Sequence, residues 1–208
     1  MKVLLINGSP HAKGCTARAL DEMIKVFSSE GIESEVIQIG NKAIRGCISC
    51  NTCSKTGKCV FGDDPVNEVT KKFEEADGIV VGSPVYYGSP NGTLISFLDR
   101  MFYSSPFSKH MKVGAAVVSC RRGGNTASFD VLNKYFTISA MPVASSNYWN
   151  MVHGFTAEDV EKDAEGLQTM RNLARNMAFL MKSIASGKDS FGLPEYERGC
   201  FTSFPDGK

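Results

Sequence analysis

The chain has 208 residues, which suits one α/β domain with a complete hydrophobic core. Its 23 basic and 22 acidic side chains give a formal net charge of +1, and no block of like charges indicates a nucleic acid or a membrane surface as a partner. No apolar run approaches the ~20 residues of a membrane span or has the form of a signal peptide, so we expect a cytoplasmic protein with small-molecule or protein partners.

The first part of the chain is predicted to form a strand, a helix and a second strand. An apolar run over Lys2–Asn7 predicts the first strand, and apolar residues three and four positions apart after Thr16 predict a helix that Gly31 ends. Residues Ser34–Ile39 alternate polar and apolar side chains, as a second strand does. A cysteine-rich insertion over residues 46–62 follows.

The middle of the chain carries the two most apolar predicted strands. A helix is expected over residues 64–76, because Asp-Pro has the residue types of a helix start. Gly78–Gly82 and Val113–Ser119 are continuous apolar runs, which are typical of strands buried on both faces. Between these strands, residues 83–92 have the Pro, Gly and Asn content of a long loop, and a further helix follows it.

The last third of the chain completes a regular α/β pattern. It is predicted to add a helix around Leu132, a fifth strand over Pro142–Tyr148 and a long helix from Thr156 to about Ile184. The start of this long helix has a capping-box pattern. Strands that alternate with helices predict a doubly wound parallel sheet of five strands, with right-handed crossovers and helices on both faces.

This architecture fixes where a ligand is expected. Ligands bind such sheets outside the carboxyl ends of the strands, where the strand order reverses, so the loops after the first, third and fourth strands are the candidate site. We assign residues 1–186 to this domain. Residues 187–208 are expected to form a tail that packs at the interface of a homodimer or homotetramer.

The loop after the first strand has the features of a phosphate site. It leads into a helix N-terminus, where free N–H groups and the helix dipole favour an anion. Ser9 and Thr16 add hydroxyl groups, Gly14 permits close approach, and His11 and Lys13 add charge when protonated. The loop matches neither the dinucleotide-binding glycine pattern nor a Walker loop. In the alternative interpretation, Ser9 and Thr16 only turn the chain and cap the helix.

Four cysteines lie within thirteen residues, in the pattern C-x2-C-x2-C-x5-C, at Cys47, Cys50, Cys53 and Cys59. A cytosolic chain keeps its thiols reduced, so metal or redox chemistry is a better explanation than disulfides. The x2-x2 spacing favours one [4Fe–4S] cluster over zinc, which more often uses two separated C-x2-C pairs. In the absence of a cluster, these cysteines are free thiols, and Cys50 or Cys53 is the candidate to lie over a bound ligand and shape substrate choice. The remaining cysteines, Cys15, Cys120 and Cys200, are expected to be structural.

Together, three groups of residues resemble the NADPH-dependent FMN reductase and iron–sulfur flavoprotein group of the flavodoxin-like superfamily. These groups are Gly8-Ser9-Pro10 with Gly14 and Thr16, Ser83–Gly88 with Phe97 and Asp99-Arg100, and the four-cysteine run. The resemblance implies a flavodoxin-like fold and an FMN whose phosphate is bound by Ser9, His11, Gly14, Cys15 and Thr16. Lys13 is a further candidate contact because of its positive charge. His11 and Cys15 stand where members of the group usually carry arginine and asparagine.

The resemblance also implies a seat for the flavin ring, which needs a flat apolar wall and backbone donors. The implied ring contacts are Pro84, Val85, Tyr86, Tyr87, Gly88 and Asn91. From its position after the fourth strand and its glycines, we expect the loop with Cys120, Gly123 and Gly124 to form a further wall. Arg121 or Arg122 is a candidate to bind the phosphates of a nicotinamide dinucleotide or a partner subunit. In the alternative interpretation, the two tyrosines are ordinary surface aromatics and the arginines lie in a solvated turn.

The predicted function is that of an FMN-dependent oxidoreductase. Hydride passes from NAD(P)H to flavin N5, and electrons then pass to a small molecule or a redox protein, with no catalytic side chain required. The alternative is an iron–sulfur flavoprotein that carries electrons, with a [4Fe–4S] cluster on the four-cysteine run and reduction by ferredoxin. A third hypothesis is a flavin-free protein whose cysteine loop binds zinc.

Overall fold

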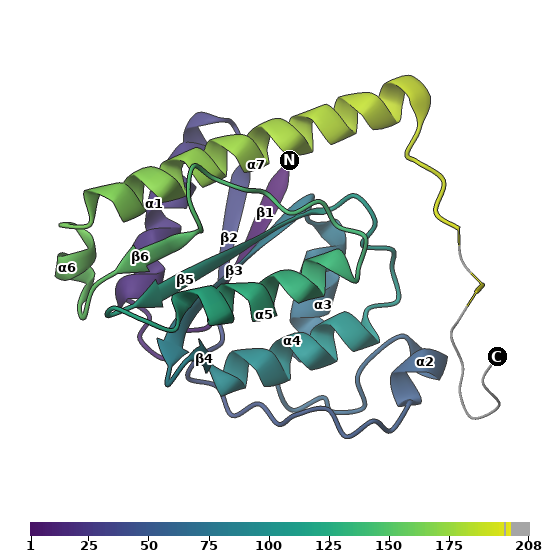
Figure 1. Ribbon diagram of the computed structural model, residues 1–208. Helices are drawn as coiled ribbons and strands as arrows, with labels where there is room; N and C mark the ends of the chain where they lie inside the picture. Colours follow the sequence, from purple (N-terminus) through teal and green to yellow (C-terminus); the bar gives the residue numbers. More distant parts are fainter. Residues whose placement is uncertain (198, 201–208) are drawn as a thin grey trace.

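A six-stranded sheet lies at the centre of the computed structural model, which describes residues 1–197 and 199–200 (Figure 1). The strands are β1 (Lys2–Asn7), β2 (Glu33–Gln38), β3 (Gly78–Tyr86), β4 (Ser89–Pro90), β5 (Val113–Cys120) and β6 (Met151–His153). Five are parallel, in the order β2-β1-β3-β5-β6, and β4 pairs with β3 in the antiparallel direction. The strand order therefore reverses between β1 and β3.

Helices cover both faces of the sheet (Figure 1). Their bounds are α1 (Cys15–Ser29), α2 (Thr52–Thr56), α3 (Val66–Glu75), α4 (Gly92–Ser104), α5 (Asn125–Thr137), α6 (Ala157–Val160) and α7 (Ala164–Phe191). Helices α1 and α7 pack on one face, and α3, α4 and α5 pack on the other. The short α2 lies in the cysteine-rich insertion. The predicted doubly wound parallel architecture is confirmed.

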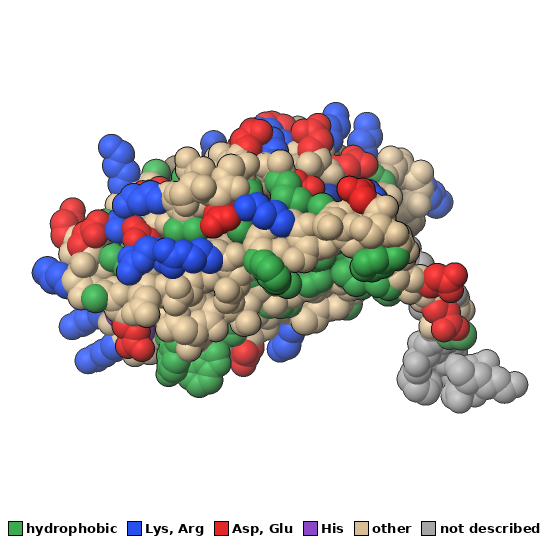
Figure 2. All heavy atoms as spheres, turned by 90° about the horizontal axis from the view of Figure 1, so that it is seen from above, with side chains coloured by type: hydrophobic (Ala, Val, Ile, Leu, Met, Phe, Trp, Pro, Cys, Tyr) green, Lys and Arg blue, Asp and Glu red, His purple; other side chains and the backbone are tan. Residues whose placement is uncertain are grey.

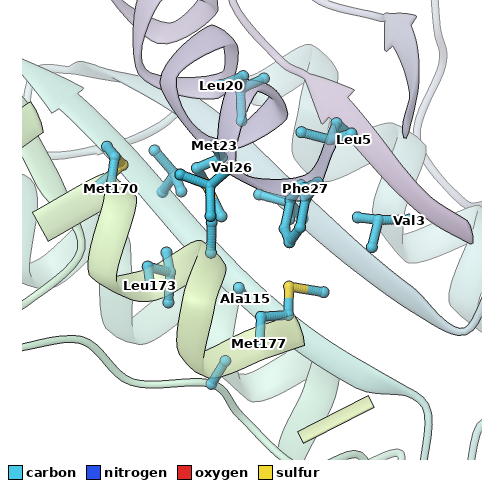
Figure 3. Close-up of a cluster of buried hydrophobic side chains, with 14 of the residues drawn as sticks. Val3, Leu5, Leu20, Met23, Val26, Phe27, Ala115, Met170, Leu173 and Met177 are labelled. Atoms are coloured by element: carbon cyan, nitrogen blue, oxygen red, sulfur yellow. The ribbon is translucent and has the colours of Figure 1, made fainter. Parts of the chain in front are cut away.

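Two hydrophobic cores lie on opposite faces of the sheet, and β1 contributes to both. Val3 and Leu5 belong to the core shared with α1 and α7 (Figure 3), whereas Leu4 and Ile6 belong to the core shared with α3, α4 and α5. Successive side chains of a strand point to opposite faces. Burial on both faces explains why β1 is a continuous apolar run in the sequence.

The third parallel strand, β3, is longer than the sequence predicts. The sequence predicts that this strand ends at Gly82 and that residues 83–92 form a loop, whereas β3 continues to Tyr86 and turns back into β4. Strand β5 extends beside this continuation, so ladder hydrogen bonds remain available past the predicted end. Tyr87 lies in the turn with a φ of +59°. The predicted loop is therefore a short hairpin.

The fifth parallel strand lies later in the chain than predicted. Residues Pro142–Tyr148 form only one bridge, to Gly114, and the strand β6 is Met151–His153 instead. The Ser146 hydroxyl donates to the Thr169 carbonyl on α7 (2.7 Å), so the chain bonds to a helix there and not to the sheet.

The single long helix predicted after Thr156 is two helices. Helix α6 is one turn that begins with the predicted capping box, in which Thr156 and Asp159 bond each other's backbone. Asp163 then begins α7 by accepting a hydrogen bond from the Gly166 N–H (2.9 Å). Its carboxylate also accepts from the His153 N–H (2.7 Å), so this side chain ties β6 to the start of α7.

The C-terminal part of the chain begins inside a helix. Helix α7 continues to Phe191, so the predicted domain boundary at residue 186 falls within it. Beyond this helix, the Tyr196 ring stacks on His110 with ring centroids 5.1 Å apart. Residues 201–208, which belong to the predicted tail, lie outside the described residues. The packing of the tail at a subunit interface stays a prediction.

The surface agrees with the near-neutral composition. Figure 2 shows the molecule from above, and basic and acidic side chains are interspersed over the visible face. Within the described part of the chain, every helix is too short or too polar to cross a bilayer. The cytoplasmic location stays a prediction.

A buried carboxylate joins α1 to α7. Glu22 accepts hydrogen bonds from Arg171 on α7 (2.6 Å), from Arg18 (2.9 Å) and from Lys25 (3.3 Å). Burial alone would raise the pKa of Glu22, but these hydrogen bonds outweigh it and lower the pKa from 4.5 to about 2. The unfolded chain therefore takes up the proton first as the pH falls.

We expect the free energy of unfolding to depend on Glu22 in acid. Its stabilising contribution is complete above pH ~4.5 and is lost as the pH falls toward ~2, with a total change of roughly 3 kcal/mol. Urea denaturation at a series of pH values measures this loss. Glu22→Gln should remove this part of the slope of unfolding free energy against pH. Asp21→Asn, at the exposed neighbouring position, is the control and should keep it. An unchanged slope in Glu22→Gln would contradict the prediction.

Candidate functional site

The loop between β1 and α1 is held by side chains and backbone from β1 and β2. Asn7 accepts a hydrogen bond from the Ser9 N–H (3.0 Å) and donates to the Gln38 side chain (2.8 Å). Gln38 in turn donates to the Ser9 carbonyl. Gly40 lies so close to this loop that a Cβ there would overlap backbone atoms of Gly8 and Ser9. The course of the loop is therefore fixed by the two strands beneath it.

The N-terminus of α1 opens onto this loop without a side-chain cap and without an acidic residue in its first turn. Ser9 and Thr16 do not cap the helix, because they have other partners. The Ser9 hydroxyl accepts from the His11 N–H (3.2 Å), and the Thr16 hydroxyl bonds the Ser119 hydroxyl (2.8 Å). The N–H groups and the dipole of α1 therefore favour an anion here, as predicted for a phosphate site.

A cleft of about 930 Å³ lies at the carboxyl ends of β1, β3 and β5. Four segments line it: residues 9–16, 84–86, 119–121 and 154–158. Its volume lies within the ~300–1,000 Å³ that is usual for pockets that bind small molecules and cofactors. The cleft therefore occupies the place where a doubly wound sheet binds its ligand, beside the reversal of strand order.

Most of the residues predicted to contact FMN line this cleft. They are Ser9, His11, Lys13, Gly14, Cys15, Thr16, Pro84, Val85, Tyr86 and Cys120. The structure thus brings the predicted phosphate loop and the predicted ring wall to one hollow. Contact between each residue and FMN stays a prediction.

The other predicted contacts lie behind or beside the cleft wall. Asn91 caps α4, where its side chain accepts from a backbone N–H of the first turn (2.7 Å). Tyr87 is fully exposed at the tip of the hairpin, and Gly123 is exposed in the loop after β5. Gly124 (φ +82°) lies against the hairpin, since a Cβ there would come 2.9 Å from the Gly88 Cα. These residues shape the wall without lining the cleft.

Sequence reasoning missed one wall of the cleft, which residues 154–158 form between β6 and α6. The Phe155 side chain is 80% exposed there, and the Cys15 thiol donates to the Gly154 carbonyl (3.5 Å). The capping box at Thr156 was a usable signal for this wall. It marks a helix N-terminus that follows a strand of a parallel sheet, and such starts lie at the carboxyl edge.

Two cysteines of the cleft are neutral at physiological pH. Burial raises the pKa of the Cys15 thiol, and the nearby Asp159 and Glu158 carboxylates raise it further. Burial also raises the pKa of the Cys120 thiol. Neither side chain therefore adds negative charge to the cleft.

The four cysteines of the insertion share a second, much smaller cavity of about 20 Å³. Its lining includes Cys47, Cys50, Cys53 and Cys59, together with Arg100 and Ser104 of α4. Across residues 1–197 and 199–200, no three Cys, His, Asp or Glu side chains lie close enough together to bind one metal ion. None of these four cysteines lines the cleft.

The chemistry of this cavity nevertheless fits an iron–sulfur cluster. All four cysteines line this one cavity, and two N–H donors already bond to sulfur atoms there: Arg100 Nε to Cys59 (3.2 Å) and the Ser49 N–H to Cys47 (3.4 Å). The Ser104 hydroxyl is buried there without a hydrogen-bond partner in the described part of the chain. Buried polar groups are normally bonded, so this hydroxyl lacks an acceptor that a cluster sulfur would provide.

Comparison with known proteins identifies the family and agrees with the fold. Residues 1–156 match the family described as NADPH-dependent FMN reductase. An iron–sulfur flavoprotein of Methanocaldococcus jannaschii is 38% identical over 195 residues, which cover 88% of this chain and 99% of that protein.

Two solved structures show the same fold at low sequence identity. RosB with a bound 8-demethyl-8-formylriboflavin-5'-phosphate intermediate has a TM-score of 0.71 at 14% identity, covering 96% of this chain and 91% of that one. A flavodoxin from the domain Archaea has a TM-score of 0.60 at 16% identity, covering 88% and 99%. The predicted flavodoxin-like fold is confirmed.

Proposed function

This chain belongs to the NADPH-dependent FMN reductase family, and we propose that it is an oxidoreductase that uses FMN to move electrons from NAD(P)H to a small molecule or a redox protein. The observation that carries the proposal is the cleft of about 930 Å³, which has an uncapped helix N-terminus at one end and a Pro-Val-Tyr wall beside it. One end suits a phosphate and the other suits an aromatic ring system. FMN would supply a ring that accepts a hydride and gives up electrons.

The residues of the cleft divide into two groups with different tasks. At the phosphate end, the N–H groups at the start of α1 and the Thr16 hydroxyl would donate to the phosphate, and Lys13 would add positive charge. At the ring end, Pro84 and Val85 would give an apolar contact surface. Tyr86, whose pKa burial raises, stays a neutral phenol there. The side chains thus bind and orient the cofactor and are assigned no proton transfer.

The loop after β5 offers a site for the nicotinamide dinucleotide. Arg121 lines the cleft, whereas its neighbour Arg122 does not. Both side chains are exposed, so each is free to meet a ligand from solvent. A guanidinium at the cleft would bind a phosphate by paired hydrogen bonds.

We expect anaerobic stopped-flow mixing of the FMN-loaded protein with NADH or NADPH to bleach the flavin absorbance with at least one of them. Arg121→Ala should raise KM for that dinucleotide about ten- to a hundredfold with little change in kcat, because a lost charge-assisted hydrogen bond costs about 1.5–3 kcal/mol. The matched control is Arg122→Ala, which should leave KM unchanged. No bleaching with either dinucleotide would refute NAD(P)H as the donor.

A second function is favoured by the cysteine cavity. The shared cavity of the four thiols and the unpartnered Ser104 hydroxyl support an iron–sulfur flavoprotein, in which Cys47, Cys50, Cys53 and Cys59 would hold a [4Fe–4S] cluster. Such a protein would carry electrons and would be reduced by ferredoxin. Iron and sulfide analysis of protein purified without oxygen tests it, since about four of each per chain are expected. A protein that contains zinc and no iron would contradict it.

A homodimer or homotetramer is also part of the proposed function. Aromatic side chains stand exposed around the mouth of the cleft, including Tyr87 at the hairpin tip and Phe155 at 80% exposure. Large exposed apolar side chains that cluster near a site are typical of a surface that meets a partner.

A further inference from the structure

The last turn of α4 presents two polar side chains to the cysteine cavity. Arg100 and Ser104 lie four residues apart, so they are neighbours on one face of the helix. Both line the cavity that the four cysteines share. Helix α4 begins directly after the β3–β4 hairpin beside the cleft and ends near α2 in the cysteine-rich insertion (Figure 1).

Arg100 is a buried and rigidly held donor. Its side chain is 1% exposed, and its Nε donates to the Cys59 sulfur at 3.2 Å. The rest of the guanidinium is fixed by both oxygens of Asp64 and by the Arg45 carbonyl (3.2 Å), and the Phe61 ring lies 5.0 Å from it. Because every contact orients the same planar group, the Nε–H remains aimed at the sulfur.

Ser104 is a buried donor that lacks an acceptor. The residue is 3% exposed, and its hydroxyl bonds to no atom of the described chain. A buried hydroxyl without a partner destabilises a protein by ~1–3 kcal/mol. The cavity that this residue lines is therefore where its acceptor is expected.

We propose that Arg100 and Ser104 donate hydrogen bonds to the sulfur atoms of an iron–sulfur cluster on Cys47, Cys50, Cys53 and Cys59 and thereby raise its reduction potential. This inference rests on the second function proposed above. A cluster gains negative charge when it takes up one electron, and donors to its sulfur atoms stabilise the more negative form. The two side chains are positioning residues, since they bond to sulfur and not to iron.

The test is a redox titration of the cluster, followed by electron paramagnetic resonance, in the wild-type protein and three variants. Ser104→Ala should retain the wild-type iron content and shift the ratio of oxidised to reduced cluster by about threefold at a fixed potential, toward the oxidised form. Arg100→Lys should shift this ratio about tenfold toward the oxidised form. That change corresponds to a midpoint potential lower by ~59 mV for one electron. Ser96→Ala is the matched control, because Ser96 is half-buried on the same helix and does not line the cavity.

A second measurement separates this role from a structural one. In iron-free protein the Ser104 hydroxyl has no partner among residues 1–197 and 199–200, so Ser104→Ala should be at least as stable as wild type in urea. Unchanged midpoint potentials in both Ser104→Ala and Arg100→Lys, with full iron content, would overturn the inference and leave the cluster proposal intact. A wild-type protein that binds no iron would refute the cluster itself, and the inference with it.

Discussion

Alanine in place of Gly40 is expected to weaken FMN binding by about five- to a hundredfold while the sheet remains folded. The new Cβ would overlap the backbone of Gly8 and Ser9, so the loop that lines the phosphate end of the cleft must move. Overpacking of this kind costs about 1–3 kcal/mol, and 1.4 kcal/mol of lost binding energy is a factor of ten. Quenching of flavin fluorescence, titrated with iron-free apoprotein, gives the dissociation constant.

The control for this variant is Gly62→Ala. Gly62 is an exposed glycine of the cysteine-rich insertion, and a Cβ there would have no atom within 4 Å. It tests the general cost of replacing glycine, and we expect its dissociation constant to equal that of wild type. If Gly40→Ala binds FMN as tightly as Gly62→Ala does, the loop after β1 is not the phosphate site.

The sequence predicts local elements well where one hydrophobic period persists. The strand expected over Lys2–Asn7 has the same bounds in the structure, because both of its faces are buried and no residue interrupts the run. The helix that follows ends as expected, with Gly31 at a φ of +71°. In both elements, residues close together in the sequence determine the structure, so the local hydrophobic pattern is enough to predict it.

The errors in the predicted fold arise where one long-range contact decides the structure. Strand β6 has three residues, which is too short for a periodic pattern, and its place depends on pairing with β5. The helix break depends on Asp163, which binds the His153 N–H ten residues earlier and begins α7. Neither contact leaves a periodic trace in the sequence.

In the candidate site too, the segments set by local sequence could be predicted, and the residues brought in by long-range contacts could not. Residues 9–16 could be predicted to line the site because they form one continuous loop, whereas residues 154–158 reach the cleft only through the fold. In the insertion, spacing identified the four thiols but not Arg100, which lies 41 residues from Cys59. Asp64 was expected to begin a helix. Its carboxylate does accept from the Val66 N–H (3.1 Å), but it also binds Arg100, a role that the local pattern does not reveal.

Replacing Asp64 by alanine is expected to lower the free energy of unfolding by about 3–5 kcal/mol. The Asp64 and Arg100 side chains are 5% and 1% exposed, so the change would leave a buried guanidinium without its counter-ion. Loss of the hydrogen bond at the start of α3 adds about 1 kcal/mol at most. Urea denaturation of iron-free protein measures the change. Asp63→Ala, at the exposed neighbouring position, is the control and should change stability by less than about 0.5 kcal/mol.

A double variant separates the ion pair from the helix start. In Asp64→Ala with Arg100→Met, no charge remains buried, and replacement of a buried pair by apolar side chains is often close to neutral. The double variant should therefore be more stable than Asp64→Ala alone by roughly 2–4 kcal/mol, a coupling that two independent sites would not show. If the two substitutions instead add, the loss in Asp64→Ala arises from the start of α3. Because the same guanidinium donates to Cys59, a confirmed coupling would also show that the ion pair stabilises the wall of the cysteine cavity.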